Sequence, residues 1–382
     1  MSAQLINDVK AIFVDTFKTE PILIFSPGRI NIIGEHTDYN DGFVFPAAVD
    51  KGIAAAIQKS DNNTSTAYAL DMDSKIEFDL DKLKPSKEGS WENYVFGVVA
   101  EIQNRNKEVG NFNIVFKGDI PGGAGMSSSA ALENSVVFGL NELFNLGLSK
   151  HEMILISQKA EHNYVGVNCG IMDQYASMFG IENHALLLDC RTVESKPYKI
   201  DFKDHQLMLI NTNVKHSLSD SAYNDRRSAC ESISELLGIK ALRDATVADL
   251  ETVKDQVTPA NYQKALYVIE ENERAVKASK AMEADDLETL GALIFASHNG
   301  LSNQYKVSCD ELDFLVDQAK ANNHVLGARM MGGGFGGCTI NLVSKDQAEA
   351  FGKSASEAYL KTFNKACSVY FIKLSEGTHI VK

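Results

Sequence analysis

Apolar residues at the start of the chain recur every three or four positions, the spacing that places them on one face of a helix. They are Leu5, Val9, Ile12, Phe13 and Phe17. Pro21 follows, and proline interrupts a helix because it has no amide hydrogen to donate. The pattern predicts an amphipathic helix over residues 3–17.

Beyond Pro21 the apolar runs become short and are separated by Gly, Pro, Asn and Asp, which is typical of strands joined by turns. We expect strands at 22–26, 43–49, 53–58 and 65–70. Helical patterns follow at 91–106, 127–146 and 150–164, with one further strand at 112–117. The first half of the chain is therefore predicted to mix strands and helices.

The second half combines the same two kinds of element. Strands are expected at 184–190 and 206–212, with a domain seam at 195–204 between them. Helices are expected over 219–320, then a glycine-rich stretch at 327–337, a strand at 338–344, a helix at 345–361 and a strand at 367–373. A chain of 382 residues exceeds the usual size of one hydrophobic core. We predict an α+β architecture with two domains, 1–200 and 201–382, and a ligand-binding cleft between them.

The charge balance narrows the range of partners. The chain has 37 Lys and Arg against 51 Asp and Glu, a formal net charge of −14, which repels nucleic acid and anionic membranes. The six cysteines show no metal-ligand spacing, and no apolar run reaches the roughly 18 residues of a membrane span. We expect a cytoplasmic protein that binds neither nucleic acid nor membrane.

The first segment with candidate chemistry is Ser26–Gly42, which directly follows a predicted strand. Glu35, His36 and Asp38 supply acceptors and at least one donor within four residues, as a ligand with many hydroxyl groups requires. One alternative is a metal site, but the paired histidines of a helical zinc motif are missing. The other alternative is a polar turn without a ligand.

A second segment, Pro121–Glu133, runs as a glycine-rich turn into a predicted helix. Free amide groups and the helix dipole at such a turn bind anions. Three successive serines, 127–129, can bind phosphate oxygens and place one hydroxyl on Mg²⁺. The lysine of a Walker A loop is missing, and a purely structural turn is the alternative.

Two carboxylates and a second glycine-rich segment complete the candidates. Glu161, in the predicted helix 150–164, would with one serine suffice to bind Mg²⁺ beside phosphates. Asp173 fits a helix N-cap as well as a base that faces a hydroxyl. Six of the twelve residues 327–338 are glycine, which suits close approach of the backbone to a ligand or another segment. A flexible hinge is the alternative there.

In this order the four segments resemble those of the GHMP superfamily of small-molecule kinases, and GRINIIGEHTDYNDG at 28–42 resembles the galactokinase signature. The resemblance extends from about residue 20 to the end of the chain. It implies an N-terminal domain like domain 2 of ribosomal protein S5 and a ferredoxin-like C-terminal domain. The active site would lie in the cleft between them, closed by a glycine-rich loop at 332–337.

The resemblance also implies an activity and a set of site residues. The activity is transfer of the γ-phosphate of ATP to the anomeric C1 hydroxyl of D-galactose, giving galactose 1-phosphate and ADP, the first committed step of the Leloir pathway. Asp173 and Arg29 would be catalytic. The sugar would contact Glu35, His36, Thr37, Asp38, Asp173 and Tyr223. ATP would contact Gly123, Ala124, Gly125, Met126, Ser127, Ser128, Ser129 and Trp91, and Mg²⁺ would be bound by Ser129 and Glu161. Met126 stands where the family commonly has leucine, a near-isosteric exchange.

Other functions fit the same scaffold and stay open at the level of sequence. Relatives phosphorylate N-acetylgalactosamine or arabinose, and some are sensors without turnover. The serines 127–129, Glu161 and Asp173 are all present, which favours an enzyme, and the acidic segment 35–38 favours a neutral sugar over an anionic substrate such as mevalonate. Beside Arg29, Asp173 would be a weak base, so we expect it to orient the hydroxyl first and accept its proton late. A monomer is expected.

Overall fold

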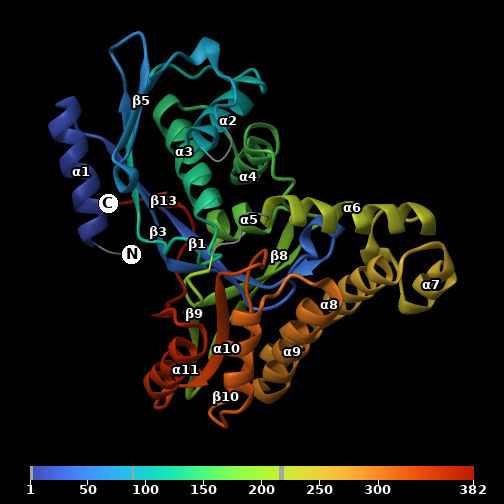
Figure 1. Cartoon of the computed structure of the whole chain (residues 1–382). Helices are drawn as coiled ribbons and strands as arrows, with labels where there is room; N and C mark the ends of the chain where they lie inside the picture. Colours follow the sequence, from blue (N-terminus) through green and yellow to red (C-terminus); the bar gives the residue numbers. More distant parts are fainter. Residues whose placement is uncertain (1–2, 88–89, 215–218) are drawn as a thin grey trace.

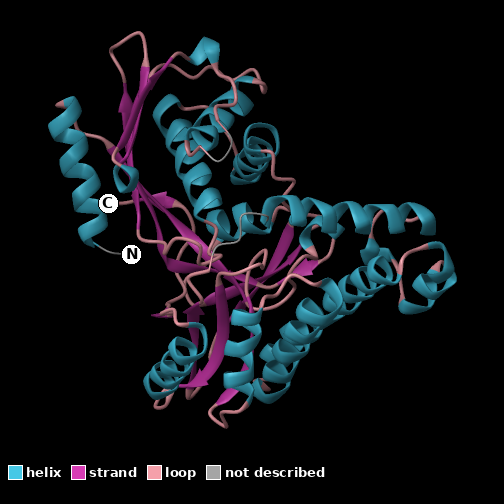
Figure 2. Ribbon diagram, in the orientation of Figure 1, coloured by secondary structure: helices cyan, strands magenta, loops and turns pink. Residues whose placement is uncertain are grey.

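The structure, a computed structural model, describes residues 3–87, 90–214 and 219–382, with only the backbone path described for 219–222 (Figure 1). The predicted opening helix is confirmed as α1 (Ala3–Phe17), which buries Leu5, Val9 and Phe13. Helices and strands are mixed in both halves, as Figure 2 shows. The predicted α+β class is therefore confirmed.

The N-terminal half is built on a six-stranded sheet in the order β13-β1-β3-β6-β4-β5. Its strands are β1 (Ile22–Asn31), β3 (Pro46–Lys59), β4 (Ser65–Ala69), β5 (Ser74–Phe78), β6 (Phe112–Gly118) and β13 (His379–Ile380). Neighbouring strands are antiparallel except β4 and β6, which run parallel. One face is covered by α1, and the other by α2 (Glu92–Gln103), α3 (Ser128–Phe144), α4 (Lys150–Ala160) and α5 (Met172–Phe179) (Figure 1).

The central strand β3 is buried on both faces, which explains its run of small apolar residues. Ala54 and Ala56 pack in the cluster beneath α1, whereas Ala55 and Ile57 face the helices on the other side. Alternate residues of a strand point to opposite faces. The strands predicted separately at 43–49 and 53–58 thus belong mainly to one long strand.

A small sheet lies beside the first and contains β2 (Phe43–Val44), β7 (His184–Asp189) and β8 (Glu194–Lys199). The strand β8 occupies the first part of the predicted seam at 195–204 and pairs with β7. It is mostly exposed, and an edge strand of this kind tolerates Pro197. This exposure explains the polar sequence on which the prediction of a domain seam at 195–204 was based. The division of the chain at 200/201 stays a prediction.

The C-terminal half contains a four-stranded antiparallel sheet in the order β10-β11-β9-β12. The strands are β9 (His205–Asn211), β10 (Val325–Met330), β11 (Cys338–Ser344) and β12 (Ser368–Phe371), and α10 (Asp310–Lys320) and α11 (Ala348–Phe363) precede β10 and β12. This βαββαβ order is ferredoxin-like, as predicted. The strand β10 extends into the stretch expected to be only a glycine-rich loop.

The α-helices that the structure describes between β9 and α10 form an arm on one side of the molecule (Figure 1). They are α6 (Ser219–Leu237), α7 (Val247–Thr252), α8 (Pro259–Glu283) and α9 (Leu287–Gly300). An apolar cluster joins this arm and the four-stranded sheet to the N-terminal half. In it, Ile32 and Phe45 of the N-terminal half pack with Ala275 and Ile340 of the C-terminal half. The two halves therefore share a buried interface.

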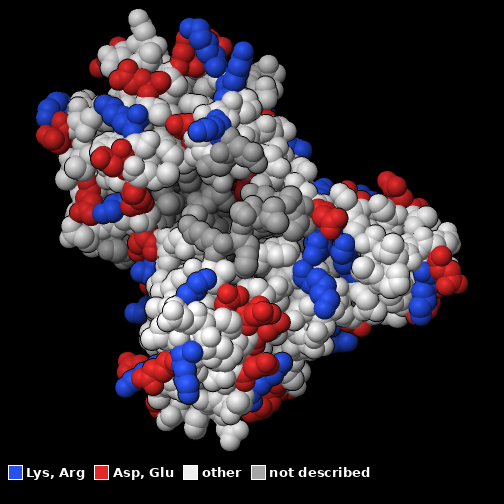
Figure 3. Space-filling model, in the orientation of Figure 1, with Lys and Arg blue, Asp and Glu red and all other residues white. Residues whose placement is uncertain are grey.

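The surface is mixed in charge. On the face drawn in Figure 3, the described Lys and Arg side chains are interspersed with Asp and Glu. In the described part of the chain, no helix has both the length and the apolar character that crossing a membrane would require.

Candidate functional site

A cavity of about 490 Å³ lies between the two halves, within the usual size range of small-molecule sites. It brings together most of the predicted site residues from four distant segments. Those that line it are Arg29, Glu35, His36, Asp38, Gly123, Ala124, Gly125, Met126, Ser127, Ser128, Ser129, Glu161, Asp173 and Tyr223, together with the loop 331–337.

Arg29 and Asp173 form a bidentate ion pair at this cavity. Arg29 Nε and Nη2 lie 2.8 and 2.9 Å from the two carboxylate oxygens of Asp173, and Arg29 Nη1 donates to the carbonyl of Gly125. Arg29 is only 4% exposed, whereas the Asp173 side chain is 26% exposed and lines the cavity. Paired N–H···O bonds of this kind fix orientation as well as distance.

Asp173 also contacts the glycine-rich turn, because the Ser127 hydroxyl donates to its Oδ2. It lies in the first turn of α5, where the N-cap is Ile171. Asp173 is therefore not the N-cap, one of its two sequence interpretations, and the positive end of the helix stabilises its charge. The same carboxylate joins the arginine, the serine turn and the cavity.

The segment 34–38 turns sharply beneath the cavity. Gly34 has φ +96°, and a Cβ there would lie 2.7 Å from the carbonyl oxygen of Phe43, so only glycine fits. The Thr37 hydroxyl lies 2.9 and 2.7 Å from the carbonyl oxygens of Gly34 and Phe43. Thr37 is fully buried and does not line the cavity. Its hydroxyl stabilises the turn, so this placement does not support the predicted sugar contact.

Three neighbouring side chains of this segment have different electrostatic states. Burial acts to raise the pKa of Glu35, but the guanidinium groups of Arg329 and Arg29 outweigh it and the pKa is lowered. Burial, and then Asp173, raise the pKa of Asp38 to about 7. Burial lowers the pKa of His36 to about 4. The segment thus offers an ionised acceptor, an acid that titrates near neutral pH and a neutral imidazole.

Aromatic rings pack together beside the cavity, and of these His36 and Tyr223 line it. The Tyr223 ring lies 5.4 Å from the His36 ring and 5.2 Å from the Tyr39 ring, centroid to centroid. The Tyr39 hydroxyl contacts His36 Nδ1 and the Tyr305 hydroxyl, each at 2.8 Å. Tyr305 was not predicted from the sequence, because it follows α9 and carries no motif that relates it to residue 39.

The two glycine-rich segments pack against each other, backbone to backbone. A Cβ on Gly125 would lie 3.0 Å from the carbonyl oxygen of Met331, and a Cβ on Gly337 would lie 3.2 Å from that of Gly123. Gly123 and Gly125 also have positive φ, 70° and 68°. The turn leads directly into α3, which begins at Ser128. The close approach of the turn at 123–125 to the loop at 331–337 therefore explains the glycines of the loop, for which a flexible hinge was the alternative.

The carboxylate predicted to bind a metal is buried among other acids. Glu161 is 8% exposed and begins a π-helical turn, Glu161–Val165, at the end of α4. Burial and the nearby Asp173 raise its pKa to about 7, and the Ser129 hydroxyl bonds to it. Buried Glu133 lies close by, with Oε1 unpaired. A cation would relieve this concentration of acids, so the residues fit Mg²⁺.

No group of three or more His, Cys, Asp or Glu side chains in the described ranges is arranged to hold a metal ion. That finding is compatible with Mg²⁺, which commonly uses one or two protein groups and completes its shell with phosphates and water.

Trp91 is the second predicted contact that lies elsewhere. Its ring packs against Phe116 at 5.3 Å in the hydrophobic core, and its Nε1 lies 3.3 Å from the Ser74 hydroxyl. It is 8% exposed and does not line the cavity. The placement therefore gives no support to an adenine contact. Tyr94, one turn further along α2, does line the cavity.

Comparison with known families matches three parts of the chain. Residues 11–59 match the galactokinase galactose-binding signature, residues 93–181 the GHMP kinases N terminal domain and residues 278–361 the GHMP kinases C terminal domain. The galactokinase of Clostridium acetobutylicum is 39% identical, covering 98% of both chains. That of Glaesserella parasuis is 40% identical, covering 94% of each.

Solved structures agree with this grouping. The Lactococcus lactis galactokinase, crystallised in complex with galactose, superimposes with a TM-score of 0.93 at 35% identity, covering 97% of this chain and 98% of the other. The mevalonate kinase of Methanococcus jannaschii shares the fold, with a TM-score of 0.65 at 16% identity over 94% of this chain and 100% of the other.

Proposed function

We propose, from the premise that the chain belongs to the galactokinase family of GHMP kinases, that its cavity transfers the γ-phosphoryl group of ATP to the C1 hydroxyl of D-galactose. The products are galactose 1-phosphate and ADP, and the reaction is the first step of galactose use. One observation carries the proposal: the Arg29–Asp173 pair lines the same cavity as the acidic 35–38 segment and bonds to the serine turn through Ser127.

Galactose is proposed to bind against Glu35, His36, Asp38, Asp173 and Tyr223. Its hydroxyl groups both donate and accept, and the mixed protonation of these side chains matches that need. A hydroxyl missing or inverted in another sugar would leave a buried polar group unpaired, which is costly. The site is therefore expected to discriminate between epimers.

ATP is proposed to place its phosphates on the turn 123–129. Amide groups there and the N-terminus of α3 attract anions. Ser129 and Glu161 would bind Mg²⁺, which when bound neutralises charge on the phosphates. Arg29 supplies positive charge beside the transferring group. These local charges offset the net charge of −14, which would otherwise repel the nucleotide.

Asp173 is proposed to orient the C1 hydroxyl and to take its proton late in the transfer. Phosphoryl transfer passes through a loose transition state, in which positioning and charge neutralisation outweigh proton removal. Since Arg29 and Ser127 both bond to Asp173, its carboxylate is held in one orientation. We further propose that the protein works in the cytoplasm as a monomer.

Replacing one carboxylate tests this role. Asp173→Asn keeps the shape of the side chain but cannot accept a proton, so kcat is expected to fall at least about a hundredfold while galactose still binds. The matched control is Asp189→Asn, because Asp189 pairs with Arg243 in a similar bidentate arrangement outside the cavity. ADP release and calorimetric galactose binding are the measurements. A variant that keeps most of its kcat would remove Asp173 from the chemistry.

A further inference from the structure

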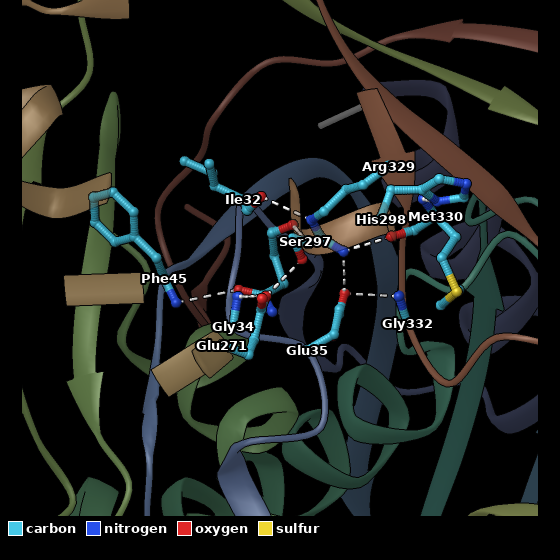
Figure 4. Close-up of polar contacts among 12 residues, drawn as sticks. Ile32, Gly34, Glu35, Phe45, Glu271, Ser297, His298, Arg329, Met330 and Gly332 are labelled. Carbon is cyan, nitrogen blue, oxygen red and sulfur yellow. Dashed lines mark hydrogen bonds and ion pairs between the residues drawn. The ribbon is translucent and has the colours of Figure 1, made fainter. Parts of the chain in front are cut away.

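Arg329 is the largest fully buried side chain in the described part of the protein. It lies in β10, in the C-terminal half, yet three of its contacts are in the N-terminal segment that carries Glu35 (Figure 4). Nε donates to the carbonyl of Ile32 at 2.9 Å, Nη2 to that of Asn31, and Nη1 to Glu35 Oε1 at 3.0 Å. Nη1 also donates to the carbonyl of Met330.

Glu35 receives a second bond from the same part of the chain. The amide of Gly332, just beyond β10, donates to Glu35 Oε1 at 2.8 Å (Figure 4). Both donors therefore reach the same carboxylate oxygen, and neither engages Oε2. Because Glu35 is 2% exposed and lines the cavity, these two bonds determine which oxygen is left for a ligand.

The backbone around Glu35 is also fixed from the C-terminal half. Glu271 of α8 accepts from the amide of Gly34 at 2.9 Å and from the Ser297 hydroxyl at 2.6 Å. The Tyr267 hydroxyl donates to the carbonyl of Glu35 at 3.0 Å. The side chain and the backbone of Glu35 are thus both positioned across the interface.

We propose that Arg329 is a positioning residue for sugar recognition: it holds Glu35, through Oε1, in the orientation that presents Oε2 to a galactose hydroxyl. This inference rests on the proposed role of Glu35 in the sugar site. Arg329 does not line the cavity, so the proposed effect on the sugar is transmitted through Glu35 alone. The affinity for galactose then depends on a contact between the two halves of the protein.

Arg329→Lys tests the inference, because lysine keeps the charge but cannot reproduce the planar set of donors. The KM for galactose is expected to rise about tenfold, which is the size of effect seen when one of two contacting residues in a hydrogen-bond network is altered. The kcat and the KM for ATP are expected to change less than threefold. The matched control is Arg243→Lys. Arg243 binds Asp189 through two bonds and joins the same two halves outside the cavity. The Arg243→Lys variant should therefore have a lower melting temperature but an unchanged KM for galactose.

Glu35→Gln separates failure of the inference from failure of the proposed sugar site. If Glu35→Gln binds galactose as the unaltered protein does, the proposed role of Glu35 is wrong. If Glu35→Gln weakens binding and a folded Arg329→Lys does not, Arg329 has no positioning role and the inference is overturned.

A double variant keeps the test available if Arg329→Lys does not fold. Glu35→Gln with Arg329→Met removes both buried charges, which proteins often tolerate better than one unpaired charge. Its galactose affinity is expected to lie within threefold of that of Glu35→Gln alone, because Arg329 acts through Glu35. A further loss of tenfold or more would overturn the inference.

Discussion

Side chains that are neighbours in the sequence differ in electrostatic state because their surroundings differ. Glu35 lies beside two arginines and stays ionised, whereas burial, and then the nearby Asp173, raise the pKa of Asp38 to about 7. The polar composition of the segment could be predicted from the sequence. The protonation states could not, since they depend on Arg329, almost 300 residues away, and on burial.

The raised pKa of Asp38 makes the stability of the ligand-free protein depend on pH. Between pH about 4 and 7 the folded state holds a proton that the unfolded state has lost, so this contribution to stability is lost as pH rises through 7. Asp38→Asn removes the buried charge. Its melting temperature is expected to exceed that of the unaltered protein by a few degrees at pH 8, with a smaller difference at pH 5.

Thermal denaturation at both pH values measures this effect, with Asp61→Asn, at an exposed carboxylate outside the cavity, as the control substitution. An Asp38→Asn variant that is less stable than the unaltered protein at pH 8 would contradict the raised pKa, because it would mean that Arg29 stabilises the ionised form of Asp38.

At the scale of elements, glycines mark the places where segments meet. Gly170, just before α5, lies against Asp38: a Cβ at residue 170 would overlap the Asp38 carboxylate. The sequence showed that Gly170 precedes Asp173 but not that it packs against the 35–38 segment. Periodicity predicts elements, whereas contacts between distant elements have no local signal.

Gly170→Ala is expected to displace the Asp38 carboxylate and raise the KM for galactose about tenfold or more, with the KM for ATP nearly unchanged. Gly122→Ala is the control, because a Cβ there would meet nothing within 4 Å. Steady-state kinetics with each substrate varied in turn give the comparison. An unchanged KM for galactose would show that the Asp38 position is not needed for sugar binding.

At the scale of the whole molecule, the end of the chain returns to the first sheet. The strand β13 pairs with β1, which carries Arg29, with Ile380 opposite Ile24. The Thr378 and Ser26 hydroxyls, both buried, lie 3.0 Å apart. The α+β class and the two-domain organisation could be predicted from the sequence, but β13 could not, since two residues carry no measurable pattern.

Thr378→Val would keep the shape of the side chain and leave the buried Ser26 hydroxyl without this partner. The free energy of unfolding is expected to fall by about 1–2 kcal/mol, as measured by denaturant titration. Thr362→Val, at an exposed helical position, should change it by less than about 0.5 kcal/mol. Equal effects of the two variants would indicate that the contact between Ser26 and Thr378 contributes little to the free energy of unfolding.

The most direct test of the proposed function is ADP release with Mg-ATP, measured against galactose, glucose, N-acetylgalactosamine and arabinose. The arrangement of Arg29, Asp173 and the 35–38 segment predicts turnover with galactose, with a kcat/KM about a hundredfold or more above that for each of the other sugars. Galactose binding without ADP release would contradict the proposed function, because the site would then recognise the sugar without catalysing transfer.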